Sequence, residues 1–175
     1  FDKVAKMIGM PYPGGKYIEL KAKGGDKNRF NFPQPLLKKN NLDFSFSGLK
    51  TAVKIEINKC KKINLKFKKD LSASFQETIT SILSTKMKLA IQLCKKNYPK
   101  IQNVVVAGGV AANNSIRLSL KEVCEENKLK IYYPPASLCG DNAAMIGWAC
   151  LQRFKVGYKG NIDFKPLPRW PLDET

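Results

Sequence analysis

Apolar side chains recur every three or four residues between positions 71 and 94, which is the spacing of one face of an α-helix. The pattern predicts that the longest helix of the chain begins at Asp70 and buries this face in the core. Shorter patterns of the same kind predict helices over residues 2–10, 47–57 and 142–154. The apolar positions of the long helix are Leu71, Phe75, Ile79, Leu83, Met87, Ala90 and Cys94.

Two short apolar runs predict β-strands. Residues 104–106 are three consecutive valines, which is typical of a strand that is buried on both faces. Residues 129–134 predict a second strand, and a helical pattern over residues 113–127 lies between the two runs. A strand, a helix and a strand in this order predict a parallel pair and therefore an α/β fold.

A pair of glycines, Gly108 and Gly109, ends the first predicted strand. Glycine permits a sharp turn and a close approach of the backbone to a ligand. The free N–H groups and the dipole of the following helix make such a turn an anion site, although many α/β domains carry the turn without a ligand. Asn113 and Asn114 stand where their side chains either cap the helix or contact a ligand. The G-x-G-x-x-G spacing of dinucleotide-binding proteins is absent.

Residues 25–69 read as a connector that contains short elements. Residues 26–42 are polar and broken by prolines. Residues 43–47 alternate polar and aromatic side chains, which predicts a short strand, and Ser47 is placed to cap the next helix. The stretch from 59 to 69 holds six lysines and predicts a solvated loop, or else a contact surface for RNA.

The charge balance narrows the classes of partner and of chemistry. The formal net charge is +17, which indicates an anionic partner, but only four of the 31 basic residues are arginines. Arginine is the side chain that matches phosphates and base edges, so the charge is moderate evidence for RNA binding. The chain has no histidine. This absence excludes a complete serine-type triad or a zinc protease site built from this chain alone.

Cysteine spacing and hydropathy bear on the cellular compartment. The five cysteines are scattered and form no C-x-x-C pair, which predicts buried thiols rather than disulfides or a zinc cluster. No apolar run approaches the length of a membrane span, and the first residues do not resemble a signal peptide. We therefore expect a cytoplasmic protein with no membrane partner. Because the chain begins inside a helical pattern, we also expect that it is part of a longer protein.

Seven stretches, in order and with compatible spacing, resemble the bacterial tRNA N6-adenosine threonylcarbamoyltransferase family, long known as the glycoprotease or O-sialoglycoprotein endopeptidase family. Each motif alone is weakly specific, but seven in register from Phe1 to Asp173 form a strong signal. The stretches are FDKVAK (1–6), YPGG (12–15), DFSFSGLKTAV (43–53), ASFQ (73–76), VAGGVAAN (106–113), LCGDN (138–142) and PRWPLD (168–173).

The resemblance implies a fold and a reaction. Residues 1–175 would form the C-terminal lobe of the actin-like ATPase superfold, with helical additions and with the N-terminal lobe outside this chain. Members move a threonylcarbamoyl group from threonylcarbamoyl-adenylate to N6 of the adenosine 3′ of the tRNA anticodon, releasing AMP. The implied cofactor is one divalent metal, Fe²⁺ or Zn²⁺, bound also by two histidines of the N-terminal lobe. The implied partners are tRNA, the adenylate, and helper subunits, namely a paralogous actin-like subunit and a small ATPase.

The resemblance also implies roles for individual residues. Asp2 matches the family's nucleotide-binding aspartate, and Gly15 matches the glycine that lies against the ligand. Glu19 falls where many members carry an aspartate on the ribose side. Asn113 matches the asparagine that contacts the nucleotide, and Asp141 matches the aspartate that binds the metal. Gly108 and Gly109 would let the main chain approach the base or the phosphates.

Structural alternatives exist for the same residues. Asp2 and Glu19 are equally compatible with surface acids, Gly15 with a turn glycine, and Asn113 and Asp141 with helix N-caps. The sequence also departs from the family pattern. Lys16 stands where proline usually follows Pro-Gly-Gly, Glu19 is one methylene longer than aspartate, and Gly140 replaces a common threonine.

Two other functions compete with the transferase hypothesis. One is a non-catalytic, actin-like nucleotide-binding module that serves in assembly, but such a scaffold would not need to retain Asn113 and Asp141. The other is the peptidase suggested by the older family name. The sequence argues against it, because Ser45 and Ser47 lack the G-x-S-x-G pattern and no histidine could activate a nucleophile.

Overall fold

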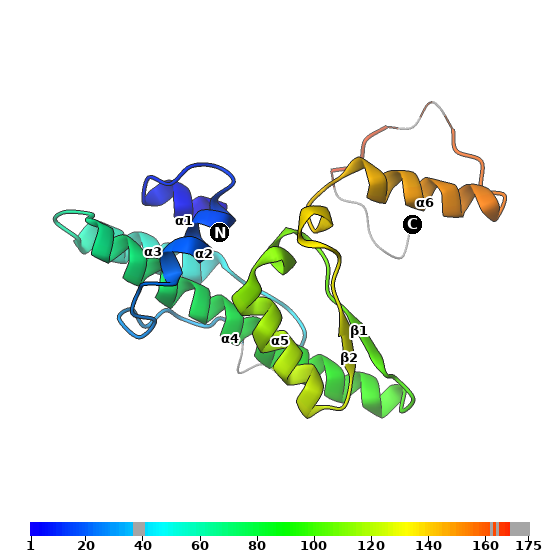
Figure 1. Ribbon diagram of the computed structural model, residues 1–175, viewed down its shortest axis with the longest axis horizontal. Helices are drawn as coiled ribbons and strands as arrows, with labels where there is room; N and C mark the ends of the chain where they lie inside the picture. Colours follow the sequence, from blue (N-terminus) through cyan, green and yellow to red (C-terminus); the bar gives the residue numbers. More distant parts are fainter. Residues whose placement is uncertain (37–40, 162, 164, 169–175) are drawn as a thin grey trace. The chain divides into compact units, whose positions relative to one another are not determined.

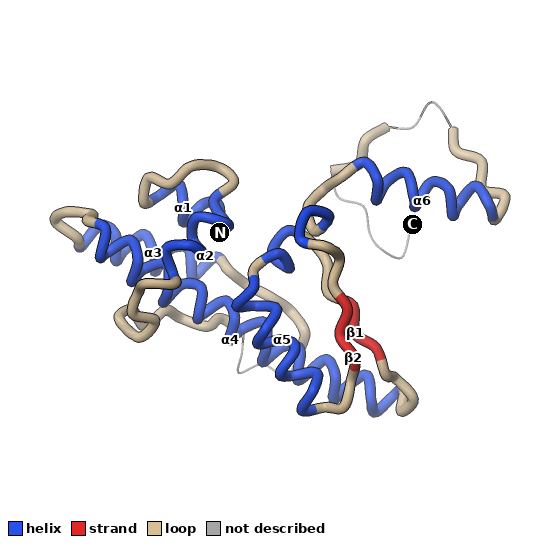
Figure 2. The backbone as a smooth tube through the Cα atoms, in the orientation of Figure 1, coloured by secondary structure: helices blue, strands red, loops and turns tan. Residues whose placement is uncertain are grey.

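A computed structural model of the chain describes residues 1–36, 41–161, 163 and 165–168 (Figure 1). It divides the chain into two compact units, Phe1–Gly140 and Asp141–Thr175. Helices dominate, and the described residues contain one two-stranded parallel sheet (Figure 2). The predicted α/β character is therefore present in a mostly helical form. Residues 37–40 of the predicted connector and 169–173 of the last family motif lie outside the described residues.

Two short helices, α1 (Asp2–Met7) and α2 (Gly14–Ala22), open the chain. They approach closely because Gly14 has no side chain. A Cβ at that position would collide with the Cβ of Ala5 and lie 3.0 Å from the Cα of Asp2. The Asp2 carboxylate also joins the two helices, since its Oδ1 accepts hydrogen bonds from the N–H groups of Gly14 (2.7 Å) and Gly15 (3.2 Å). These N–H groups have no partner within α2 itself.

The predicted helix from residue 47 is confirmed as α3 (Ser47–Lys59), but two details of the prediction are wrong. Ser47 is the first residue of α3 rather than its cap, since the N-cap position is Phe46 and no side chain caps the helix. The segment 43–47, predicted as a strand, pairs with no strand in the described part of the chain. An isolated strand has no ladder to stabilise it. The rings of Phe44 and Phe46 nevertheless stack, with centroids 6.0 Å apart and planes at 15°.

The longest helix is α4 (Leu65–Asn97). It begins at Leu65, whereas the sequence pattern predicts a start at Asp70. Asn64 provides the N-cap, because its Oδ1 accepts a hydrogen bond of 2.8 Å from the N–H of Phe67. The second half of the lysine-rich stretch is consequently helical rather than a loop. Lysine is a good helix former, so a capped start makes this helical extension favourable.

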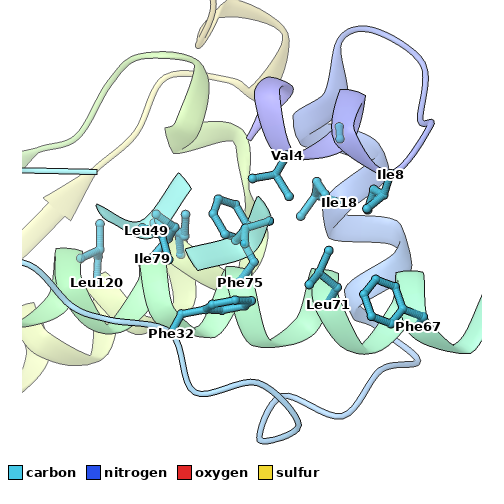
Figure 3. Packing of buried hydrophobic residues seen from close by; sticks show 13 residues of the cluster. Val4, Ile8, Ile18, Phe32, Leu49, Phe67, Leu71, Phe75, Ile79 and Leu120 are labelled. Carbon is cyan, nitrogen blue, oxygen red and sulfur yellow. The ribbon is translucent and has the colours of Figure 1, made fainter. Parts of the chain in front are cut away.

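The apolar face of α4 forms the centre of the main core, as predicted (Figure 3). Full burial of each large apolar side chain contributes about 1.5–3 kcal/mol. Side chains from α1, α2, α3, α5 (Asn114–Glu126) and the loop after α2 surround this face. The labelled members of the core are Val4, Ile8, Ile18, Phe32, Leu49, Phe67, Leu71, Phe75, Ile79 and Leu120.

A buried carboxylate fastens the loop after α2 to α4. Asp70 is 1% exposed, and its Oδ1 accepts a hydrogen bond of 2.9 Å from the N–H of Asp26. Its Oδ2 accepts one of 2.6 Å from Arg29 and lies 3.4 Å from the ammonium of Lys66. The hydrogen bond from Asp26, followed by those from Arg29 and Lys66, lowers the pKa of Asp70 despite the opposing effect of burial.

The predicted strand–helix–strand unit is confirmed. Strands β1 (Asn103–Val105) and β2 (Lys130–Tyr132) pair in parallel, with Val104 opposite Ile131, and α5 connects them. The burial prediction is wrong: the side chain of Val104 is half-buried and Val105 is 72% exposed. A sheet of two strands is covered on both faces only when further elements pack against it, and none within residues 1–36 and 41–140 covers Val105.

The second unit contains α6 (Ala143–Lys155), which agrees with the predicted helix over residues 142–154. Asn142 caps it, because its Oδ1 accepts a hydrogen bond of 2.9 Å from Met145 N–H. Among the described residues, no helix has both the length and the apolar character that crossing a membrane requires. All five cysteines are described and none forms a disulfide. Cys124 and Cys139 are buried as predicted, whereas Cys150 is exposed.

We predict that Asp70→Ala lowers the free energy of unfolding by about 1–3 kcal/mol, because the N–H of Asp26 and the guanidinium of Arg29 lose their acceptor. Asp70→Asn retains an acceptor oxygen for Asp26 and should cost less. Urea denaturation followed by circular dichroism at pH 7 measures both. Equal stability of all three proteins would contradict the role given to this carboxylate.

The pH dependence of stability provides a second test of Asp70. Its folded pKa lies below the ordinary value of 3.8, so its ionised form stabilises the fold above that value and the stabilisation disappears as the pH falls through the folded pKa. The gap in urea midpoint between wild type and Asp70→Asn should be constant from about pH 5 to 7 and narrow below about pH 4. A gap that widens on acidification would show that the sign is wrong.

Gly14 and Gly15 form a matched pair for testing the packing of α1 on α2. Gly14→Ala should destabilise the protein by about 1–3 kcal/mol, because the added Cβ overlaps α1. A Cβ on Gly15 would meet only the Cβ of Phe1, at 3.8 Å, so Gly15→Ala should be neutral or stabilise α2 by up to about 1 kcal/mol. Thermal denaturation measures both variants, and equal losses would contradict this packing.

Candidate functional site

A pocket of about 530 Å³ lies at the starts of α1 and α2 and beside the 3₁₀ turn Gly109–Ala112. It brings together five of the six residues expected to contact a nucleotide, although they come from segments nearly 100 residues apart in the sequence. The sixth, Gly108, immediately precedes Gly109. The residues that line the pocket are Phe1, Asp2, Pro13, Gly15, Lys16, Glu19, Gly109, Val110, Ala112 and Asn113.

Asp2 lies at the wall of this pocket with one of its oxygens already committed. Its Oδ1 holds the N–H groups of Gly14 and Gly15, whereas its Oδ2 has no hydrogen-bond partner among the described residues. Gly15 is the second of these glycines and faces open space apart from Phe1. The close packing therefore belongs to Gly14, and Gly15 is the glycine that leaves room in the pocket.

Glu19 connects α2 to the start of α5. Its Oε1 accepts hydrogen bonds from the N–H of Asn114 (2.9 Å) and from the side-chain amide of the same residue (3.1 Å). The carboxylate thereby satisfies a free N–H group at the beginning of α5, where the helix dipole favours negative charge. Its Oε2 makes no hydrogen bond with a described residue and remains available to a ligand in the pocket.

Asn113 is the N-cap of α5, as the structural alternative proposed. Its Oδ1 accepts a hydrogen bond of 3.1 Å from Ile116 N–H, and its Nδ2 donates one of 2.8 Å to Gln76 Oε1. Gln76 in turn donates a hydrogen bond of 3.0 Å to Ser115, so the orientation of the Asn113 amide is fixed from both ends. A side-chain amide has two acceptor sites and two donor hydrogens. The bonds to Ile116 and Gln76 use one of each, which leaves one acceptor site and one donor hydrogen for a ligand.

The Gly108–Gly109 turn presents open main chain. Gly108 has φ +93° and ψ 163°, a conformation that essentially only glycine adopts. A Cβ at either glycine would meet no atom within 4 Å. Helix α5 starts at Asn114, as the predicted helix over residues 113–127 requires, and the 3₁₀ turn Gly109–Ala112 separates it from Gly108. The N–H groups of Asn114 and Ile116 at the helix start are held by Glu19 and Asn113, so the open main chain of this region lies at the glycine turn.

Asp141 begins the second unit and is exposed immediately before α6. It does not cap this helix, since Asn142 does. Within the described residues no group of three or more His, Cys, Asp or Glu side chains could hold a metal ion. The Asp141 carboxylate can supply one ligand to a metal ion. A stable metal site requires further ligands, and the described residues supply no group of three.

Two residues, one lining the pocket and one bonded to Asn113, carried a sequence signal without an assigned role. Lys16, noted only as a departure from the family pattern, lines the pocket together with Asp2 and Glu19. Gln76 belongs to the ASFQ stretch and positions Asn113 through its buried amide. Val110 belongs to the VAGGVAAN stretch, but an apolar residue after a glycine turn does not by itself indicate a binding role.

Comparison with known proteins identifies the family. The family model described as TsaD, tRNA N6-adenosine threonylcarbamoyltransferase, matches residues 1–148. The tRNA N6-adenosine threonylcarbamoyltransferase of Chelativorans sp. is 46% identical over 179 residues, covering 100% of this chain and 49% of that protein. The proteins of the same name from Paramagnetospirillum magneticum and Ehrlichia canis are 43% and 45% identical, with 100% and 99% of this chain covered and 51% and 49% of theirs.

The chain thus spans about half the length of the curated relatives it matches. The matched model covers the pocket, the parallel strands and α5, and the relatives align with nearly every residue of the chain. The chain belongs to the tRNA N6-adenosine threonylcarbamoyltransferase family.

Proposed function

We propose that this chain is the C-terminal lobe of an actin-like ATPase fold and forms part of the active site of a tRNA-modifying transferase. The reaction moves a threonylcarbamoyl group from threonylcarbamoyl-adenylate to N6 of the adenosine 3′ of the anticodon. The observation that carries the proposal is the convergence of Asp2, Gly15, Glu19, Gly109 and Asn113 on one pocket. Its volume of about 530 Å³ falls in the range of small-molecule sites.

The groups in the pocket suit the adenylate half of this substrate. Asp2 Oδ2 and Glu19 Oε2 are acceptors for the two ribose hydroxyl groups. The main chain at Gly15 and Gly109 allows the base or the phosphate to approach without a side chain in between. Asn113 has one donor and one acceptor left after capping α5, so it can fix the orientation of the ligand.

Asp141 is the metal ligand in this proposal. A carboxylate oxygen is a suitable ligand for Fe²⁺ or Zn²⁺, and the chain has no histidine, so the two imidazole ligands come from outside residues 1–175. When bound, the metal acts as a Lewis acid that polarises a carbonyl or phosphoryl oxygen of the substrate. The residues of this chain contribute binding and orientation of the adenylate. The proposed partners are tRNA, the adenylate, a paralogous actin-like subunit and a small ATPase.

A non-catalytic, nucleotide-binding assembly module is the alternative, and one observation favours it. Asp2, Glu19 and Asn113 each make hydrogen bonds that stabilise the starts of α2 or α5, so each has a structural reason to be present. Asp141 separates the two functions. It does not cap α6, and only the transferase proposal gives its carboxylate a role, at the metal.

We predict that nucleotide affinity responds to two changes in the pocket. Gly15→Ala should weaken AMP binding by roughly 5- to 150-fold, because its methyl group enters space that the ligand needs. Glu19→Gln retains the acceptor for Asn114 and should weaken binding by roughly 2- to 10-fold. Isothermal titration of the full encoded protein with AMP measures both, and Gly160→Ala, at a glycine with no neighbour within 4 Å, is the control. Unchanged affinity in both variants would contradict the assigned pocket.

We also predict that residues 1–175 alone do not catalyse the transfer. One carboxylate holds a metal weakly, and acyl transfer depends on preorganised groups around a centre that excludes water. The full encoded protein with its helper subunits should modify tRNA, and Asp141→Ala in that protein should lower the rate by about 100-fold or more. Mass spectrometry of digested tRNA measures the product. Robust modification by the isolated 175-residue chain would contradict the proposal, and full activity of Asp141→Ala would contradict the metal role of Asp141. A full protein that binds AMP but modifies no tRNA would favour the assembly module.

A further inference from the structure

A second cavity of about 580 Å³ adjoins the proposed nucleotide pocket. The two share Phe1, Asp2 and Val110 as lining residues. The second cavity lies between the starts of α1 and α3 and the apolar face of α4. Its lining residues are Phe1, Asp2, Lys3, Val4, Phe46, Ser47, Leu49, Lys50, Phe75, Ile79, Leu83 and Val110.

The floor of this cavity is apolar and one wall is an exposed aromatic ring. Phe75 and Ile79 are buried at the floor, with exposed fractions of 4% and 6%. Phe46 is 41% exposed and stacks on Phe44, which is 50% exposed. Two stacked phenylalanines that remain in solvent present a flat apolar face. Unstacked bases of single-stranded nucleic acids bind to such faces, because every base has a π surface.

The charges at the mouth favour an anionic ligand. Lys3 and Lys50 line the cavity and Lys16 lines the adjoining pocket. None of the three forms an ion pair with a carboxylate in the described part of the chain. Among the described residues Asp2 is the one acidic side chain that lines the second cavity, and its Oδ1 is held by the N–H groups of Gly14 and Gly15. Free ammonium groups beside an aromatic platform match the phosphates on either side of a base.

We propose that this cavity receives an unstacked base from a single-stranded RNA loop, with the base against Phe46 and the flanking phosphates at Lys3 and Lys50. The inference rests on the proposed function, whose acceptor adenosine lies in the anticodon loop of tRNA. It adds the location of that acceptor: the base enters beside Asp2, at the boundary with the pocket that holds the adenylate. The RNA and the adenylate thereby occupy neighbouring cavities that share one wall.

The test uses the full encoded protein and an anticodon stem-loop RNA with 2-aminopurine in place of the acceptor adenosine. Wild-type protein should change the fluorescence of this base on binding. Phe46→Leu retains apolar bulk but loses the aromatic face, so RNA affinity should fall by roughly 5- to 150-fold and the fluorescence change should disappear. Phe46→Trp keeps an aromatic face, so its RNA affinity and its fluorescence change should match those of the wild type. Tyr98→Ala, which removes an aromatic side chain that is 69% exposed elsewhere, is the control and should leave both unchanged.

The lysines are tested by the salt dependence of the same binding. Lys3→Gln and Lys50→Gln should each reduce the slope of log affinity against log salt concentration by about 0.7, the value for one phosphate contact on a single strand. Lys100→Gln removes an equal charge from an exposed position outside both cavities and should leave the slope unchanged. Unchanged slopes for Lys3 and Lys50 variants would overturn the assignment of the phosphates.

Adenine nucleotide titrations separate this proposal from the function on which it rests. Phe46→Leu should leave AMP affinity unchanged. If Phe46→Leu weakened AMP binding and not RNA binding, the cavity would belong to the small substrate and the RNA proposal would be overturned. If it weakened neither, the cavity would be covered by another part of the protein, which also overturns the proposal. If Gly15→Ala left AMP binding intact while Phe46→Leu weakened RNA binding, the nucleotide pocket would fail and the RNA site would stand.

Discussion

The burial of residues 70–76 in α4 is the constraint on which the rest of the first unit depends. Seven consecutive buried residues mean that the helix is covered on every side, so its polar side chains depend on partners from the surrounding segments. Three of the four polar side chains have such partners, and the Ser72 hydroxyl is buried without one among the described residues. Asp70 binds Asp26 and Arg29, Ser74 binds Asp26 and Phe30, and Gln76 binds Asn113 and Ser115. One helix thereby fixes the loop after α2 and the start of α5 through specific hydrogen bonds.

The same hydrogen bonds explain how the pocket is positioned. Apolar packing is not directional, so it brings α1, α2 and α5 to α4 without fixing where their ends lie. The polar contacts supply that direction: Gln76 orients Asn113, Glu19 ties α2 to Asn114, and Asp2 holds the start of α2. Residues that line the pocket therefore hold it together as well. Preorganisation of this kind lowers the cost of ordering a site when a ligand binds.

A second cavity, lined by aromatic and cationic residues, adjoins the pocket. The segment before α3 is not a strand, and its two phenylalanines remain stacked and exposed, with Phe46 lining the same cavity as Phe1 and Asp2. A strand would place alternate side chains against a neighbouring element and bury them. The absence of a ladder leaves these rings available as a surface. Lys3 of α1 and Lys50 of α3 line an apolar cavity that shares Phe1, Asp2 and Val110 with the proposed nucleotide pocket.

The sequence by itself determined the elements with strong local signals and the family. Periodic apolar positions marked α4, capping by Asn113 was proposed for α5, and seven motifs in register identified the relatives. Tertiary structure decided the rest. Helix α4 begins at Leu65 rather than at Asp70, because the Asn64 side chain caps it there. The segment 43–47 is not a strand, because no other strand in the described part of the chain pairs with it. Gly14 and Gly15 look identical in sequence. In the folded chain Gly14 packs against α1, whereas Gly15 faces the pocket. A local sequence pattern does not contain the distances between segments on which this difference depends.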